Sequence, residues 1–123
     1  MMINARVLVV EDDPANQMTM SALLHGMGHT PTVAERGDDA LRILDTPQPL
    51  DLIISDVVMP GMSGLDFARR ARLARPGMPI VLVTGDSDAM ESVLESGAIA
   101  LLKPYSPDTL RQVVGESLEA RGA

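Results

Sequence analysis

The chain carries, close to its start, the stretch Val7-Leu8-Val9-Val10-Glu11-Asp12-Asp13, followed directly by Pro14. Four consecutive apolar residues, most of them β-branched, are typical of a strand buried on both faces of a parallel sheet. Asp13 and Pro14 suit a helix N-cap and the first helical position. The stretch therefore predicts a buried strand that delivers acidic side chains to the start of a helix.

Short apolar runs alternate with helical patterns along the rest of the chain. The expected strands are 7–10, 30–34, 52–54, 80–83 and 99–102. The expected helices cover 37–44, about 64–75 and about 87–96, and two more begin at Pro14 and Pro107. Such alternation implies a parallel sheet with helices on both faces. Because crossovers are right-handed, the leading candidate is a five-stranded, doubly wound α/β sheet.

The length and composition favour one ordinary globular domain. With 123 residues, 46% of them hydrophobic, we expect a single domain over 1–123 with its core at about 5–118. No apolar run approaches the length of a membrane span. The absence of cysteine excludes disulfides and thiolate metal sites, and it favours a cytoplasmic location.

The charge balance argues against a nucleic-acid-binding surface. The net charge is −7, and the only aromatic residues are Phe67 and Tyr105. A basic patch and a platform for base stacking are therefore both missing. We expect no direct contact with nucleic acid or with a membrane.

Reactive side chains gather where a ligand site is expected. In open α/β sheets, ligands bind beyond the carboxyl ends of the strands. Glu11 and Asp12 follow the first expected strand, Asp56 the third, Thr84 the fourth and Lys103 the fifth. Carboxylates this close repel one another, and a hard divalent cation such as Mg²⁺ offsets the repulsion. No histidine or cysteine lies near these strand ends, which disfavours zinc.

These side chains suit phosphoryl transfer. Asp56 is ionised at neutral pH and can attack phosphorus as a nucleophile. A cation and the Lys103 ammonium can neutralise the phosphoryl oxygens, and the Thr84 hydroxyl can donate a hydrogen bond. Taken singly, each residue has a plainer role as a turn former or a solvated side chain. The joint position at separate strand ends is what indicates function.

Several motifs resemble those of bacterial two-component response-regulator receiver domains. The matching stretches, in order, are Val7–Asp13, Asp56–Gly64, Val83–Gly85 and Lys103–Tyr105. The resemblance covers about Ala5 to Leu118. It implies a flavodoxin-like sheet of strand order 2-1-3-4-5 with five helices.

The resemblance also implies a signalling switch. Asp56 would accept a phosphoryl group from a phosphohistidine on a sensor histidine kinase or a histidine phosphotransfer protein. Thr84 and Lys103 would contact that group, and binding to a downstream protein would change. The domain would then be no enzyme, apart from catalysing its own phosphorylation and dephosphorylation.

A metal site follows from the same resemblance. Asp12 would ligate Mg²⁺, or Mn²⁺ in its place, directly. Glu11 would act through water, and Asp56 and the backbone carbonyl of Val58 would complete the protein ligands. The Lys103–Pro104 peptide bond is expected to be cis, which proline permits at low cost.

One position departs from the family pattern. Receiver domains usually carry Tyr or Phe three residues before the lysine, and here that residue is Ala100. The segment from Gly97 to Lys103 is also one residue short. We therefore expect coupling to partners to run through the Thr84–Gly85 loop and the fourth helix.

Other functions fit less well. A small Mg²⁺-dependent phosphatase of haloacid-dehalogenase type also uses an aspartate nucleophile, but it needs a second acid where this chain has Val58. A nucleotide-binding fold needs a glycine-rich loop after the first strand, and here that loop is acidic. An unphosphorylated docking module would not need the intact acids, Thr84 and Lys103.

The end of the chain leaves its context open. The sequence stops shortly after the last expected helix, so we expect no DNA-binding output domain within it. The chain is then either a stand-alone receiver or a part of a longer regulator or hybrid kinase.

Overall fold

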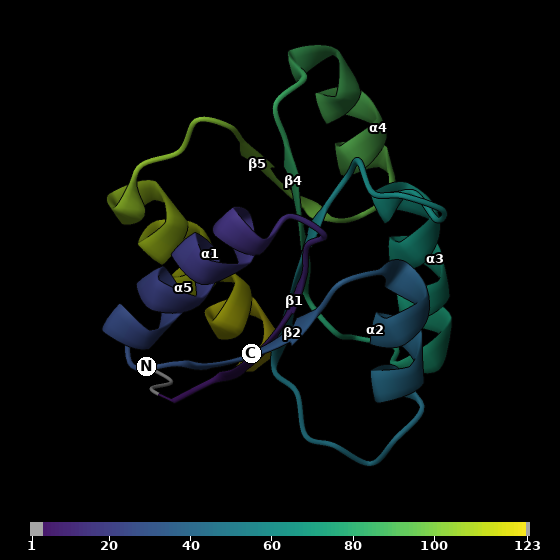
Figure 1. Ribbon diagram of the computed structural model, residues 1–123, viewed down its shortest axis with the longest axis horizontal. Coiled ribbons are helices and arrows are strands. Elements are labelled where there is room, and N and C mark those ends of the chain that lie inside the picture. Colours follow the sequence, from purple (N-terminus) through teal and green to yellow (C-terminus); the bar gives the residue numbers. More distant parts are fainter. Residues whose placement is uncertain (1–3, 123) are drawn as a thin grey trace.

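The computed structural model describes residues 4–122, which form a parallel sheet covered by helices (Figure 1). Its strands are β1 (Arg6–Val10), β2 (Thr30–Ala34), β3 (Leu52–Asp56), β4 (Ile80–Thr84) and β5 (Ile99–Leu102). Its helices are α1 (Pro14–Gly26), α2 (Gly37–Leu44), α3 (Gly64–Ala74), α4 (Met90–Glu95) and α5 (Pro107–Gly122), with a 3₁₀ turn, η1 (Ser87–Ala89), before α4. None of these helices combines the length and the apolar character that crossing a bilayer requires.

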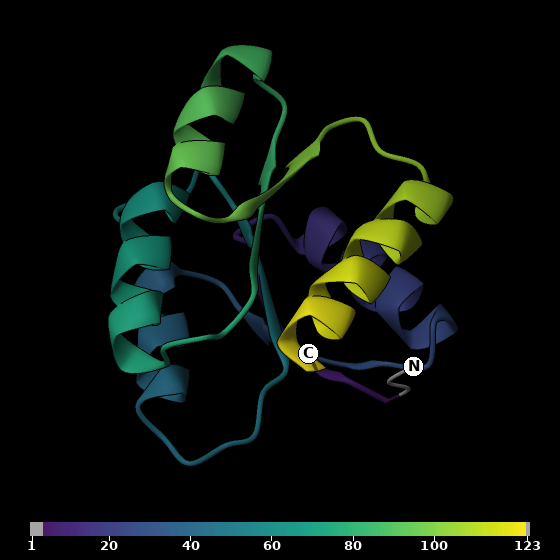
Figure 2. The ribbon, with the colours of Figure 1, turned by 180° about the vertical axis from the view of Figure 1, so that it is seen from behind.

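The strand order confirms the predicted topology. All neighbouring strands pair in parallel, in the order β2-β1-β3-β4-β5. Helices α1 and α5 cover one face of this sheet, and α2, α3 and α4 cover the other (Figures 1 and 2). Because the order reverses beside β1, the β1 and β3 carboxyl ends lie at the topological switch point, where such folds bind ligands.

Side-chain alternation along the strands builds a separate core on each face. Val7 and Val9 of β1 pack with α1 and α5, whereas Leu8 and Val10 pack with α2 and α3. This follows from the two-residue period of a strand. Phe67 of α3 is fully buried in the second core, where burial of such a ring stabilises the fold by about 1.5–3 kcal/mol.

The first helix begins and ends as predicted. The Asp13 side chain accepts a hydrogen bond from the Ala15 backbone N–H at 3.3 Å, and Pro14 is the first helical residue. The helix ends at Gly26, and Gly28 turns the chain with a φ of +87°. That left-handed conformation favours glycine, so Gly28 sets where β2 can start.

Four boundaries differ from the sequence prediction, and the smallest difference is that β1 begins one residue earlier, at Arg6. Strands β3 and β4 extend beyond their apolar runs to Asp56 and Thr84, which pair with Val83 and Leu102. The ladder depends on backbone groups, so pairing continues where the side chain turns polar. The fourth helix starts with the 3₁₀ turn η1, capped by the Asp86 carboxylate, instead of an α-helical turn.

A histidine is buried where β1 and β2 begin, at the opposite end of the strands from their carboxyl ends. His29 is 8% exposed, and its Nδ1 accepts a hydrogen bond from the Ala5 backbone N–H at 3.0 Å. Burial lowers the pKa of His29, and the negative charge of Asp51 opposes this only in part. The folded protein therefore holds a neutral imidazole.

This neutral histidine predicts a pH dependence of stability. Since the pKa of His29 is lower in the folded than in the unfolded chain, its contribution is complete above the unfolded pKa and is lost as pH falls through the folded one. His29→Asn keeps a hydrogen-bond acceptor for Ala5 but cannot titrate. We expect urea denaturation to show a smaller loss of stability in His29→Asn than in the native chain as the pH falls below the ordinary histidine pKa of about 6.5.

The other histidine supplies the matched control. His25 lies near the end of α1 with its side chain exposed. His25→Asn should retain the native pH profile. Identical profiles for the native chain and His29→Asn would contradict the assignment of a buried neutral imidazole.

Candidate functional site

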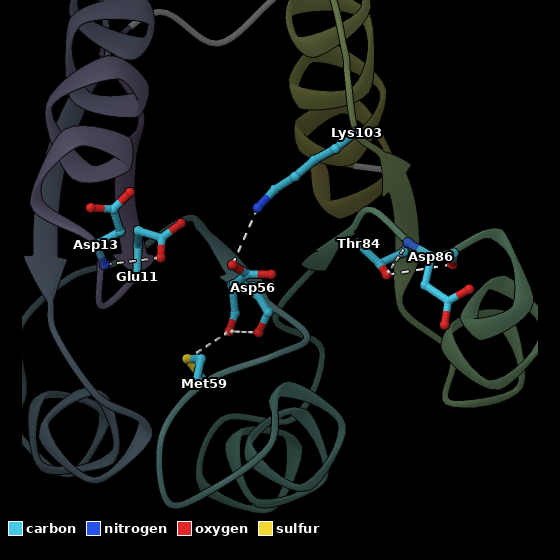
Figure 3. A network of polar contacts seen from close by, with 8 residues as sticks. Glu11, Asp13, Asp56, Met59, Thr84, Asp86 and Lys103 are labelled. Atoms are coloured by element: carbon cyan, nitrogen blue, oxygen red, sulfur yellow. Dashed lines mark hydrogen bonds and ion pairs between the residues drawn. The ribbon is translucent and has the colours of Figure 1, made fainter.

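The carboxyl ends of the strands bring together most of the predicted site residues. Asp56 and Thr84 are the last residues of β3 and β4, and Lys103 follows β5 directly. Glu11 and Asp12 follow β1. Figure 3 shows Asp56 between Glu11 on one side and Lys103 and Thr84 on the other.

Three carboxylates form a cluster at this edge. Glu11, Asp12 and Asp56 each offer an oxygen, and these oxygens all lie within 4.8 Å of one another. Their mutual repulsion is costly unless a positive charge is close. A set of carboxylate oxygens without nitrogen or sulfur donors suits a hard cation such as Mg²⁺ or Mn²⁺. The donor set therefore fits the predicted metal.

Glu11 is the most deeply buried of the three acids. Its side chain is 8% exposed, and its carboxylate accepts a hydrogen bond from the Asp13 backbone N–H at 3.2 Å (Figure 3). Burial raises the pKa of Glu11; the Asp13 hydrogen bond opposes this shift, and the Asp56 charge adds to it. A nearby cation would favour the charged form of this carboxylate.

Lys103 supplies the positive charge that the structure holds beside the cluster. Its Nζ donates to Asp56 Oδ2 at 3.3 Å, and the Asp56 side chain is only 13% exposed. The pair joins the ends of β3 and β5, which do not neighbour each other in the sheet. The Lys103–Pro104 peptide bond is cis, as the resemblance implied.

Thr84 lies in the same region but faces a different partner. Its hydroxyl oxygen accepts a hydrogen bond from the Asp86 backbone N–H at 3.0 Å, and the side chain is 2% exposed. Figure 3 shows this hydroxyl turned toward Asp86 and away from Asp56. The structure therefore brings the acids and Lys103 together, and it leaves Thr84 engaged with the loop before η1.

The loop after β3 is fixed by close backbone packing. The Gly64 N–H donates to the Val57 carbonyl at 2.7 Å. A Cβ on Gly64 would lie 2.6 Å from Val57 Cα and closer still to the Asp56 carbonyl oxygen. Only glycine permits this approach. In the same loop the Val58 side chain is 77% exposed, so it does not contribute to the core.

Two further residues support the site, and the sequence analysis missed them. Gln17 Nε2 donates to the Glu11 backbone carbonyl at 2.6 Å. Ser55 Oγ donates to the Asp56 carbonyl at 3.0 Å and contacts Met59 Sδ at 3.8 Å. Ser55 interrupts the apolar run of β3, and this was the available signal. The sequence holds no comparable signal for Gln17, because its contact depends on how α1 leaves β1.

Comparison with known families decides the class of protein. The family model described as the response regulator receiver domain matches residues 7–115. This chain belongs to the response regulator receiver domain family. Members of this family are signalling switches of two-component systems.

Individual relatives agree with this assignment. The DNA-binding response regulator MtrA of Mycolicibacterium smegmatis is 39% identical over 108 residues, which cover 85% of this chain and 46% of MtrA. The chain thus spans about half the length of this relative. The structure of the Vibrio cholerae chemotaxis protein CheY4 is 30% identical with a TM-score of 0.84, and the match covers 94% of this chain and 99% of CheY4.

A third relative is described with a metal. It is the receiver domain of the sensor histidine kinase PA1611 from Pseudomonas aeruginosa PAO1, with a magnesium ion coordinated in its active-site cleft. It is 27% identical to this chain with a TM-score of 0.85, and the match covers 94% of this chain and 98% of that one.

The close approach at Gly64 predicts a strong effect of one methyl group. Gly64→Ala forces backbone atoms apart next to Asp56, and overpacking of this kind costs about 1–3 kcal/mol. We expect urea denaturation to show a loss of stability of that size. Amide chemical shifts of residues 55–58 should also change.

A glycine in open space is the control. Gly115 lies inside α5, and a Cβ there meets nothing within 4 Å. Gly115→Ala should stabilise the domain by about 0.5–1 kcal/mol through helix propensity. If both substitutions changed the free energy of unfolding by the same amount, the close backbone contact at Gly64 would not be the reason why alanine destabilises that position.

Proposed function

We propose that this receiver domain is a phosphoacceptor switch in which Asp56 takes a phosphoryl group from a phosphohistidine. The observation that carries the proposal is the position of the Asp56 carboxylate. It lies 3.3 Å from the Lys103 ammonium and belongs to the cluster with Glu11 and Asp12. A nucleophile, a cation site and a fixed positive charge are what phosphoryl transfer requires.

The metal is assigned to the acidic cluster. Asp12 and Asp56 would ligate Mg²⁺ or Mn²⁺ directly, Glu11 would act through water, and the Val58 carbonyl would complete the set. When bound, the cation neutralises phosphoryl oxygens. The carboxylate oxygens within 4.8 Å of one another support this assignment.

The residues of the chain then have distinct tasks. An Asp56 oxygen bonds to phosphorus while the bond from phosphorus to the donor imidazole nitrogen breaks, and that nitrogen leaves with the bonding pair. Lys103 holds Asp56 before transfer and pairs with the phosphoryl oxygens afterwards. Thr84 can donate to the phosphoryl group when its O–H turns away from the Asp86 carbonyl, 3.5 Å away, and its oxygen can still accept from the Asp86 amide.

The partners follow from the family. A receiver domain takes its phosphoryl group from a histidine kinase or a histidine phosphotransfer protein, and it changes how a downstream protein binds. We propose that the domain, residues 1–123, lies in the cytoplasm and does not itself contact nucleic acid or membrane. The net charge of −7 supports the absence of a nucleic-acid surface. The DNA-binding activity in the name of MtrA belongs to that relative.

The alternatives have less support. A phosphatase of the aspartate-nucleophile class needs an acid where the exposed Val58 stands, so we propose no catalysis beyond the chemistry of the domain's own phosphoryl group. Burying charged side chains costs free energy. A docking module that is never phosphorylated gives no reason for the buried Glu11 or for the Lys103–Asp56 pair.

Phosphorylation by a small donor is the direct experiment. We expect the chain, incubated with acetyl phosphate and Mg²⁺, to gain one phosphoryl group in intact mass. The gain should disappear with a chelator or in Asp56→Asn, because each removes a required group. Asp39→Asn, which changes a half-exposed acid on α2 that pairs with Arg42 and not with the cluster, should react like the native chain.

Two results would contradict the proposal. Equal phosphorylation of Asp56→Asn would exclude Asp56 as acceptor, and a reaction that proceeds without divalent cation would remove the metal site. Steady turnover of a phosphate monoester would favour the phosphatase.

The contacts of Thr84 predict where the switch is transmitted. When the hydroxyl donates to the phosphoryl group in place of the Asp86 carbonyl, the backbone of Asp86 loses a contact, and Asp86 is the residue that caps η1 by accepting from the Asp88 N–H at 2.9 Å. We expect phosphorylation to change amide shifts in residues 84–96 more than elsewhere outside the site. Unchanged shifts there, in a chain whose mass shows the phosphoryl group, would contradict coupling through this segment. Asp56→Asn treated with the same donor is the control.

A further inference from the structure

The end of α3 carries two arginines that bind the ends of the neighbouring helices. α3 lies between α2 and α4 on one face of the sheet (Figures 1 and 2). Arg75 donates to the Leu44 carbonyl at 3.2 Å and to the Thr46 carbonyl at 2.7 Å, where α2 ends. Arg72 donates to the Ser96 carbonyl, where α4 ends. The two arginines therefore tie both flanking helices to α3.

The contact of Arg72 with the end of α4 has a clear physical reason. The last carbonyls of a helix lack partners within the helix and carry partial negative charge, so a guanidinium beside them is favourable. The guanidinium also lies over Gly97, since a Cβ on Gly97 would lie 3.4 Å from Arg72 Cζ. Arg69 and Arg70 of the same helix pair instead with Asp66. Arg72 thus differs from these two in holding the backbone of another helix.

The remainder of α4 contributes little packing. The helix has six residues, and Val93 is the one that is buried. Leu94 is 61% exposed. Because so short a helix is marginal without tertiary contacts, the position of α4 depends strongly on how its two ends are held.

The two ends of α4 are held in different ways. The amino end follows η1, whose capping residue Asp86 is held by the Thr84 hydroxyl through its carbonyl at 3.5 Å and its N–H at 3.0 Å. The carboxyl end is held by Arg72. α3 is itself fixed beside Asp56 by the close approach of Gly64. A change at the Thr84 hydroxyl therefore acts on the amino end of α4, while the carboxyl end stays joined to α3.

We propose that Arg72 is the anchor of α4: it fixes the carboxyl end of this helix, so that a change in the contact between Thr84 and Asp86 turns α4 about Ser96. The anchor itself is independent of phosphorylation. Its part in signalling rests on the proposed function, since the phosphoryl group is what would draw the Thr84 hydroxyl from the Asp86 carbonyl. Residues at the end of an element are the usual place for such a hinge.

The first experiment measures how firmly the anchor holds. Amide hydrogen exchange of the unphosphorylated chain is followed at Ser96 and Gly97, whose N–H groups donate to carbonyls of α4. In Arg72→Met, which keeps an apolar side chain but no donor, we expect exchange at these amides to be at least about fivefold faster. Arg72→Lys, which keeps a positive charge and a donor, should exchange more slowly than Arg72→Met.

Arg75→Met is the matched control, because it removes the equivalent contact with α2. It should speed exchange at Asp45 and Thr46, the amides at the end of α2. It should leave Ser96 and Gly97 at the native rate. General destabilisation would speed exchange at both helix ends in both variants, so opposite patterns in the two variants separate the anchor from a loss of overall stability.

The second experiment releases the amino end of α4 without any phosphoryl donor. Thr84→Val keeps nearly the shape of the buried side chain but removes the hydroxyl and both of its contacts with Asp86. We expect amide shift changes in residues 86–90 and native shifts at Ser96 and Gly97. When Thr84→Val is added to Arg72→Met, the changes relative to Arg72→Met alone should extend to residues 96–97.

Three results would overturn the proposal. They are native exchange at Ser96 and Gly97 in Arg72→Met, equally fast exchange there in Arg75→Met, or shift changes in Thr84→Val that are as large at residues 96–97 as at 86–90. If these patterns appear as expected but acetyl phosphate does not phosphorylate the chain, the anchor stands and the proposed function fails. If phosphorylation occurs and the patterns are absent, only the anchor fails.

Discussion

The electrostatic constraint on this domain is the crowding of three carboxylates at one edge of the sheet. Oxygens of Glu11, Asp12 and Asp56 lie within 4.8 Å of one another, and such a cluster is unfavourable without positive charge. Lys103 meets part of this need through its pair with Asp56. The remaining need suits a divalent cation, and the all-oxygen donor set of the three carboxylates suits a hard one.

The fold supports this cluster through backbone contacts that leave little freedom. The Gly64 N–H binds the Val57 carbonyl, and the lack of a side chain on Gly64 lets α3 begin directly against the end of β3. Gln17 holds the Glu11 carbonyl from α1, and Ser55 holds the Asp56 carbonyl. Acidic side chains that would otherwise separate are therefore fixed by neutral neighbours, in the manner of a preorganised site.

The same edge of the sheet connects the site to its surroundings. Thr84 binds the Asp86 amide, and Asp86 caps η1, so the hydroxyl that could meet a phosphoryl group also sets the start of the fourth helical segment. On the other side, a hollow between α1 and the segment after β5 contains Asp56 and Lys103 in its lining. Ala100 stands where this family usually has an aromatic residue, and the expected route to partners is therefore the Thr84–Gly85 loop and the fourth helix.

The sequence by itself determined the alternation of strands and helices and the helix cap at Asp13, and it predicted the candidate site residues, because apolar periodicity and strand ends are local features. The strand order followed from the resemblance to receiver domains. The sequence-based prediction ended β3 and β4 too early, because backbone pairing continues past the apolar residues to Asp56 and Thr84. Only the tertiary structure decided that Thr84 faces Asp86, that Gln17 holds Glu11, and that a hollow lies beside the acids. These features depend on the exact distance between elements far apart in the chain, and no local pattern encodes that distance.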